Sequence, residues 1–306
     1  MINLPPRLSL AEAPSRISGR VCLWVSPSVR AWVELHFPWP VQNNVTLDVD
    51  WLVVVGGGQI IDKAKAIKLA HPHLNLAIAP SLWGSGAEAS PIIVSDDAGF
   101  KRIRIDSAAL PELILDVPEL AASVPVERAR LACGDAWSHA LEGLLSPLAS
   151  EVLRADLCEV IRSMSLLSFE PDPRWFMLSA LACAGQAKSS VGLIHGIAHE
   201  LEGPLRKANP YGPWFHARLC SIFLLPVMRY NASRSDKLIT SLKHGGVDVE
   251  LIWQRLTELH DHAAYLLTLP TLREHWRRVL INPCSRTNST IVNDKALDFL
   301  EGFQVT

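Results

Sequence analysis

The hydrophobic period of this chain changes near residue 120, and that change limits the folds that the chain can adopt. Before it, short apolar or β-branched runs alternate with a helical pattern at 60–70; the runs lie at 20–25, 51–55, 76–79 and 113–115. A further run at 100–105 alternates and suits one arm of a hairpin after the turn signal at 96–99. Strands that alternate with helices predict an α/β domain with a largely parallel sheet.

After residue 120 the apolar residues recur with the period of an α-helix. Ser123 is expected to cap a helix that runs into Arg128, with Glu127 in its first turn. Further helices are predicted at 149–168, 174–202, 215–231, 249–267 and 270–279, with breaks at Pro204, Pro210, Pro213 and the Asn-Pro pair at 282–283. We therefore expect an α/β N-terminal domain (1–119) and an all-α C-terminal domain (120–306), with the functional site in the cleft between them.

The composition argues against several classes of protein. Apolar residues make up 49% of the 306 residues and charged residues 20%, close to the averages of soluble globular proteins. A net charge of −2 gives no reason to expect nucleic acid or an anionic membrane as a partner. The chain start lacks a secretory pattern, and the longest apolar runs are far shorter than the roughly 20 residues that span a bilayer. Six scattered cysteines without a Cys-x-x-Cys pair indicate reduced thiols and a cytoplasmic protein.

Two glycine-rich turns follow predicted strands. Gly56-Gly57-Gly58 ends the 51–55 strand and begins a helix, and Gly84-Ser85-Gly86 lies in the loop after the 76–79 strand. Glycines let the backbone approach a pyrophosphate, and the free N–H groups of a helix N-terminus bind its charge. Three glycines alone are equally typical of a tight strand-to-helix turn. Because both turns would lie at the carboxyl edge of the sheet, together they favour a phosphate-bearing cofactor.

Histidine and aspartate residues recur at helical spacing in the second half. Asp135 and His139 are four residues apart, so both project from one helix face, and His195 and His199 repeat this spacing. His216 begins a third helix. Any one of these histidines is as easily a satisfied core or surface residue. Three helices that each present nitrogen or oxygen ligands are a stronger pattern, because such a set suits a divalent transition metal ion.

Five segments resemble, in order, the motifs of the iron-containing alcohol dehydrogenases. Residues 56–65, GGGQIIDKAK, are similar to the family's GGGSxxDxAK, and residues 80–88 are similar to its PTTAGTGSE loop. Residues 134–142, GDAWSHALE, resemble DALTHAIE, and residues 195–199, HGIAH, resemble HGMAH. Residues 215–216, followed by LLPVMRYN at 224–231, resemble the segment that carries the last metal ligand. The series runs from about residue 51 to residue 231, and an ordered series is far more specific than any single motif.

The resemblance implies a fold, a reaction and a set of site residues. The fold would be dehydroquinate synthase-like, with a Rossmann-like α/β domain and a helical domain. The chain would interconvert a small-molecule alcohol and an aldehyde or ketone, with the substrate oxygen on the metal and hydride passing to or from NAD or NADP, and a homodimer is among the expected assemblies. His199 would lie near the substrate and relay protons. Fe²⁺ or Zn²⁺ would be held by Asp135, His139, His195 and His216, and the nucleotide by Gly57, Gly58, Asp62, Ser81, Leu82, Ser85 and Lys101.

Several departures from the family pattern leave alternatives open. Only 55 residues precede Gly56, and one strand is predicted there, so we expect a shortened nucleotide-binding domain. A non-catalytic or cofactor-deficient metal-binding relative is therefore one alternative. A redox-neutral, dehydroquinate synthase-like enzyme is another, although such enzymes generally supply three protein ligands. Trp83 is expected to narrow the nicotinamide pocket, the loop 204–213 to overhang the cleft, and Glu142 either to support the metal site or to be an exposed helix residue.

Overall fold

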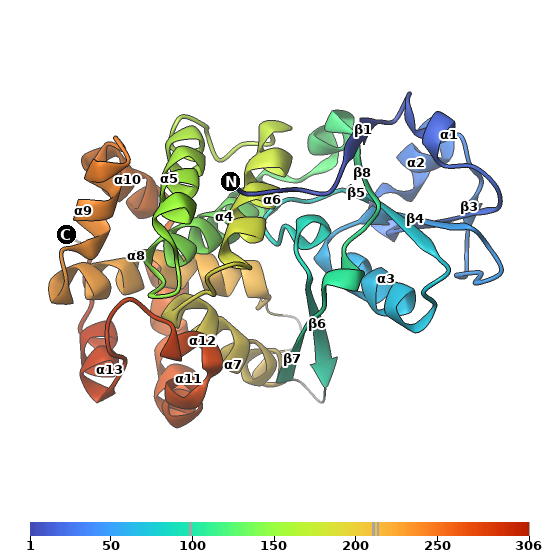
Figure 1. Cartoon of the computed structure of the whole chain (residues 1–306). Helices are drawn as coiled ribbons and strands as arrows, with labels where there is room; N and C mark the ends of the chain where they lie inside the picture. Colours follow the sequence, from blue (N-terminus) through green and yellow to red (C-terminus); the bar gives the residue numbers. More distant parts are fainter. Residues whose placement is uncertain (98–99, 210–211, 213, 306) are drawn as a thin grey trace.

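The N-terminal part of the chain forms a six-stranded parallel sheet (Figure 1). The computed structural model describes residues 1–97, 100–209, 212 and 214–305. The strand order is β1-β8-β5-β4-β2-β3, and every neighbouring pair is parallel. This confirms the predicted largely parallel sheet. The strands are β1 (Arg7–Ser9), β2 (Val21–Val25), β3 (Val41–Gln42), β4 (Trp51–Gly56), β5 (Asn75–Pro80) and β8 (Leu113–Asp116).

Both faces of the central strands are buried, which explains their continuous apolar sequence. Alternate side chains of a strand point to opposite faces. Val54 and Ile78 face helix α3 (Gly58–Ala70) in one apolar cluster. Val53 and Ala77, which are paired in the sheet, belong to the main core, which also contains the helices of the second half. The sheet is thus covered by α3 on one side and by the C-terminal helices on the other.

An antiparallel hairpin extends from the sheet region toward the helical half (Figure 1). It is formed by β6 (Ile92–Asp97) and β7 (Phe100–Ile105), as the alternating pattern predicted. β6 packs on α3, and β7 packs on helix α7 (Leu193–Ala208). The hairpin therefore connects the sheet and α3 to the helix α7, which carries His195 and His199. Residues 98 and 99 of the expected turn lie outside the described residues.

Helix α4 (Val126–Leu145) is the centre of the helical half. Every residue from Ala132 to Leu145 is buried, and the helix packs against α5, α6 and α8. A helix that is enclosed on all sides places its polar side chains in the interior, where they need partners. The other helices are α5 (Glu151–Ser165), α6 (Arg174–Gln186), α8 (His216–Arg234), α9 (Lys237–His244), α10 (Val249–Leu259), α11 (His262–Ile281), α12 (Pro283–Arg286) and α13 (Asp294–Glu301).

Several predicted helix boundaries are wrong. Ser123 does not cap α4: its hydroxyl bonds the Leu120 carbonyl, at the end of a 3-10 turn at 118–123, and α4 begins after Pro125. The predicted 174–202 helix is two helices, α6 and α7, and Ser190 between them has a positive φ of 81°. The predicted 249–267 helix is also divided, because Asp261 caps the start of α11.

The predicted break at Pro204 is wrong, because Pro204 lies inside α7. The helix predicted at 270–279 is part of the longer helix α11, which contains Pro270. The predicted break at 282–283 is confirmed, because Asn282 ends α11 and caps α12. Pro210 and Pro213 of the expected overhanging loop lie outside the described residues.

More helices and strands precede Gly56 than the sequence pattern predicted. Besides β2, the structure has β1, β3 and the helices α1 (Ala13–Arg16) and α2 (Arg30–His36). The main core is continuous across residues 119 and 120. The domain boundary that we predicted there therefore remains a proposal. Of the helices that the structure describes, none has the length and apolar character needed to cross a membrane.

Candidate metal and cofactor site

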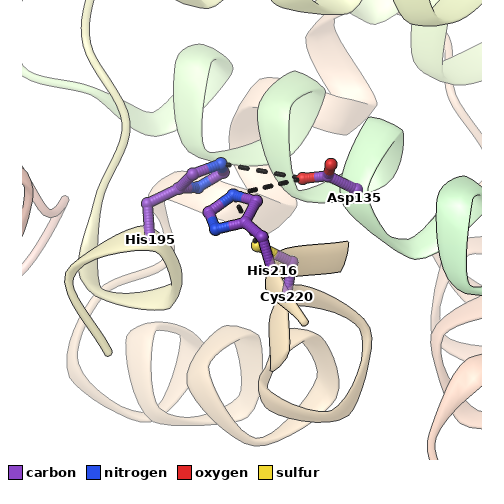
Figure 2. Close-up of side chains that lie close together, drawn as sticks. All are labelled: Asp135, His195, His216 and Cys220. Carbon is purple, nitrogen blue, oxygen red and sulfur yellow. Dashed lines mark hydrogen bonds and ion pairs between the residues drawn. The ribbon is translucent and has the colours of Figure 1, made fainter. Parts of the chain in front are cut away.

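Four side chains from three helices converge in the interior of the helical half (Figure 2). Asp135 comes from α4, His195 from α7, and His216 and Cys220 from the first turns of α8. One ligand atom from each lies within 4.8 Å of the others. The Asp135 Oδ1 is 3.7 Å from His216 Nε2 and 3.9 Å from His195 Nε2, and Cys220 Sγ is 3.5 Å from His216 Nε2.

These spacings suit ligands around one ion. Two nitrogen or oxygen ligands at about 2.1 Å from a tetrahedral ion are separated by about 3.4 Å, and a sulfur ligand at about 2.3 Å lies slightly farther away. Nitrogen-to-oxygen distances of 3.7 and 3.9 Å are too long for hydrogen bonds. Inward movement of a few tenths of an ångström would bring these atoms to coordination distance.

The electrostatics of the cluster also call for a cation. Asp135 and His195 are 2% and 3% exposed, yet Asp135 Oδ1 and His195 Nε2 have no hydrogen-bond partner. Such atoms cost about 1–3 kcal/mol each when they are left unpaired. Burial lowers the pKa of His195 and of His216 well below the usual range, so both rings are neutral, the form that binds metal. Burial raises the pKa of Asp135, and neutral rings do not oppose this rise, whereas a divalent cation would favour the ionised carboxylate. The residues present therefore fit a metal ion.

Glu142 orients one of the histidines. Its Oε2 lies 2.7 Å from His195 Nδ1, and its Oε1 accepts the Ile194 N–H at 2.6 Å. Burial raises the pKa of Glu142 to about 8, and in its ionised form Glu142 would accept the Nδ1 hydrogen and leave the lone pair of Nε2 directed at the cluster. Carboxylate support of this kind is usual for metal-binding histidines. Glu142 is 3% exposed, so its interpretation as an exposed helix residue is wrong.

His139 lies beside the cluster without joining the four atoms that converge. Its Nδ1 is 3.1 Å from the Gly84 carbonyl and 4.0 Å from Asp135 Oδ1, and its ring lies 4.6 Å from the His195 ring. The structure thus brings three of the four predicted ligands together and adds Cys220, which sequence analysis missed. The signal that would have found it is the spacing of four residues from His216.

His199, the predicted proton relay, stacks on His216. Their ring centroids are 5.2 Å apart, and His199 Nδ1 is 3.7 Å from Cys284 Sγ. Burial, with the positive charge of Lys101 adding to it, lowers the pKa of His199 to about 4. Lys101 reaches this region from β7 and pairs with Glu202 of α7 at 3.3 Å. The contact holds the hairpin against the helix that carries both His195 and His199.

The two glycine turns lie against each other at the carboxyl ends of β4 and β5. Gly57 precedes α3 in extended conformation, and no side chain caps this helix end. A Cβ on Gly57 would meet only Leu82 Cβ, at 3.9 Å, whereas a Cβ on Gly58 would lie 2.8 Å from Ser85 Oγ. Ser81 is tied to this edge by its N–H, which bonds the Gly56 carbonyl. Uncapped N–H groups beside an open glycine fit a diphosphate.

Asp62 does not face the same open edge. Its Oδ1 lies 3.6 Å from the buried Lys65 ammonium, under the hairpin. Burial raises the pKa of Asp62 to about 6, and Lys65 and the Val94 N–H oppose this rise. Its assignment to the cofactor therefore stays a prediction, without a contact that distinguishes it from a structural ion pair.

Comparison with known proteins identifies the group to which these features point. No protein-family model matches the chain. Maleylacetate reductase 1 of Rhodococcus opacus is 29% identical over 206 residues, which are 64% of this chain and 55% of that protein. The 1-propanol dehydrogenase of Salmonella typhimurium is 30% identical over 197 residues, 58% of this chain and 50% of that protein.

Solved structures share the whole fold. The iron-containing alcohol dehydrogenase of Thermococcus thioreducens superposes with a TM-score of 0.71 and 21% identity, over 98% of both chains. The chain is a homologue of the iron-containing alcohol dehydrogenases. The sulfoacetaldehyde reductase of Bifidobacterium kashiwanohense, solved in complex with NAD⁺, superposes with a TM-score of 0.77 and 16% identity, over 98% of this chain and 97% of that chain.

The sequence match to the curated relatives is partial. The chain spans about half the length of those it matches. The solved structures, at 21% and 16% identity, establish the fold of this iron-containing alcohol dehydrogenase homologue, not its substrate.

One departure from the alcohol dehydrogenase loop has a structural explanation. Trp83 is 2% exposed and packs edge-on against Phe176 of α6, with its indole Nε1 3.3 Å from the Ala129 carbonyl of α4. The side chain fills the core between the second glycine turn and the central helix. The expectation that Trp83 narrows the nicotinamide pocket is therefore not supported.

Proposed function

We propose that the chain is a metal-dependent, NAD(P)-linked oxidoreductase that interconverts an alcohol and an aldehyde or ketone. The observation that carries the proposal is the convergence of Asp135, His195 and His216, in which the buried Asp135 Oδ1 and His195 Nε2 have no hydrogen-bond partner. Relatives are named as reductases and dehydrogenases, and one structural neighbour was solved with NAD⁺. These names support the reaction class, while the substrate is left to experiment.

The chain offers one set of residues for each cofactor. Asp135, His195 and His216 would hold Fe²⁺ or Zn²⁺, and His139 and Cys220 both lie where a fourth ligand would come from. The nucleotide would be held by Gly57, Gly58, Asp62, Ser81, Leu82, Ser85 and Lys101. When bound, the metal polarises a carbonyl or makes an alcohol more acidic, and the nicotinamide carries the hydride.

The protein's own groups have distinct tasks. The uncapped N–H groups that begin α3 would bind the nucleotide phosphates. Glu142 holds His195 in the orientation that directs Nε2 inward. His199, which is neutral at pH 7, can accept a proton at a ring nitrogen and return it in the reverse direction. The ion pair of Lys101 and Glu202 links the hairpin to α7, the helix that carries His199.

The test is metal analysis with nucleotide titration on anaerobically purified protein. Wild type should retain about one metal ion and bind NADH or NADPH. His195→Ala and His216→Ala should lose both the metal and turnover, while His244→Ala, at an exposed position, should keep both. Full activity in a metal-free His216→Ala protein would refute the assignment.

Two outcomes would favour an alternative function over the proposed one. Metal retention without nucleotide binding at millimolar concentration would support a cofactor-deficient relative. Tightly bound NAD that is regenerated within each turnover would support the redox-neutral, dehydroquinate synthase-like alternative.

A further inference from the structure

We propose that Cys220 is a metal ligand, a thiolate that completes a site with Asp135, His195 and His216. The inference rests on the proposed metal site and adds a ligand that the family resemblance does not imply. Cys220 lies four residues after His216, so both side chains leave the same face of α8. It is fully buried, and its Sγ lies 3.5 Å from His216 Nε2. Figure 2 shows the sulfur directed at the same point as the two rings and the carboxylate.

The convergence does not depend on the cysteine alone. Asp135 Oδ1 and His195 Nε2 are buried, unpaired and carried by two other helices, α4 and α7. Both atoms lie within 4.8 Å of the sulfur and of His216. The thiol does not lie in apolar surroundings: the Asp135 carboxyl, Ser138 and His216 are its polar neighbours. The position therefore has the character of a binding site.

His139 is the competing candidate, and it lies outside the group of converging ligand atoms. Its Nδ1 is directed at the Gly84 carbonyl at 3.1 Å. That carbonyl is held in place, because the Gly84 N–H donates to Ser179 Oγ at 2.7 Å. Among the described residues, the group of atoms that lie within coordination reach of one another includes Cys220 and leaves His139 out.

Charge balance favours the thiolate as well. With two neutral imidazoles, one carboxylate and one thiolate, the four ligands themselves would carry two negative charges, which offset those of a divalent ion in a buried site. On binding, the S–H bond is replaced by a sulfur–metal bond, and the proton passes to the solvent. A soft sulfur ligand also biases the site toward Zn²⁺ or Co²⁺ and away from Mg²⁺ or Mn²⁺.

Cobalt substitution tests the proposal directly. The full-length protein is stripped of metal with a chelator and titrated with Co²⁺ under anaerobic conditions. Wild type and His139→Ala should develop a thiolate-to-cobalt charge-transfer band in the near ultraviolet. Cys220→Ser should lose this band while it keeps the weaker visible cobalt bands. Cys284→Ser is the matched control, because Cys284 is the thiol beside His199 and should leave the band unchanged.

The outcomes separate this proposal from the metal site itself. Wild type that binds Co²⁺ without a charge-transfer band, or a Cys220→Ser protein that keeps it, overturns the role of Cys220 alone. Wild type that binds no Co²⁺ overturns the metal site and Cys220 together. We also expect Cys220→Ser to bind Zn²⁺ about 100-fold more weakly than wild type. Thermal melting of the metal-free proteins establishes that each variant is folded.

Discussion

The spacing of helices α4 and α8 should control metal affinity through Gly134. This glycine precedes Asp135 on α4 and faces α8 at Ser221, the residue after Cys220. A Cβ on Gly134 would lie 2.5 Å from Ser221 Cβ and 2.8 Å from its Cα. Ordinary contact begins near 3.4 Å, so Gly134→Ala should push the helices apart by about 0.9 Å at this point.

A displacement of this size should strongly weaken metal binding but have only a small effect on folding stability. Ligand distances in a functional site are held to about 0.2 Å, so moving Asp135 away from His216 and Cys220 by several times this amount should weaken metal binding at least about tenfold, or 1.4 kcal/mol. Overpacking costs about 1–3 kcal/mol, but alanine gains about 1 kcal/mol over glycine in a helix. We therefore expect the metal-free protein to lose only about 0–2 kcal/mol of stability.

Chelator competition for Zn²⁺ and urea unfolding of the metal-free protein measure the two effects separately. Gly143→Ala on the same helix is the control, because its added Cβ would meet its nearest atoms at 3.2 Å and needs little movement. Adding Ser221→Gly to Gly134→Ala removes the closest contacts and should restore part of the affinity. Unchanged zinc affinity in Gly134→Ala would show that the contact between α4 and α8 does not position the ligands.

Three further predictions concern other buried polar groups. Glu142→Gln should lower zinc affinity about 10–100-fold, measured by the same competition, while the exposed Glu127→Gln should not change it. Burial raises the pKa of Glu88 to about 7, so this group should cost wild type stability as the pH rises from about 4.5 to 7, and Glu88→Gln should lose less stability over the same range. The variant should therefore gain about 1–3 kcal/mol over wild type at pH 8 relative to pH 5 in urea unfolding, and an equal effect at both pH values would contradict this reasoning. Arg154 donates to three main-chain carbonyls around the end of α4, so Arg154→Met should lower the free energy of unfolding by about 1–3 kcal/mol, and a neutral result would show that water replaces these bonds.

The local sequence was sufficient to predict those strands and helices whose pattern lies within a few neighbouring residues. The strands β4, β5 and β8 and the helix α3 were predicted because apolar runs and glycine turns lie within a few residues of one another. The strand β1 escaped prediction because its three residues owe their conformation to β8, where Arg7 pairs with Ile114, more than 100 residues away. The break between α6 and α7 was missed because the apolar pattern continues through it. The break is visible only in the backbone, where Ser190 has a positive φ.

The metal site shows the same division. The ordered family motifs were enough to select Asp135, His195 and His216 as candidate ligands, whereas the spacing of four residues predicted only which side chains share a helix face. The inclusion of Cys220 and the support from Glu142 depended on which faces of α4, α7 and α8 meet. Periodicity indicates which side chains share a helix face, but only packing decides what that face contacts, so the convergence of these four side chains appears only in the tertiary structure.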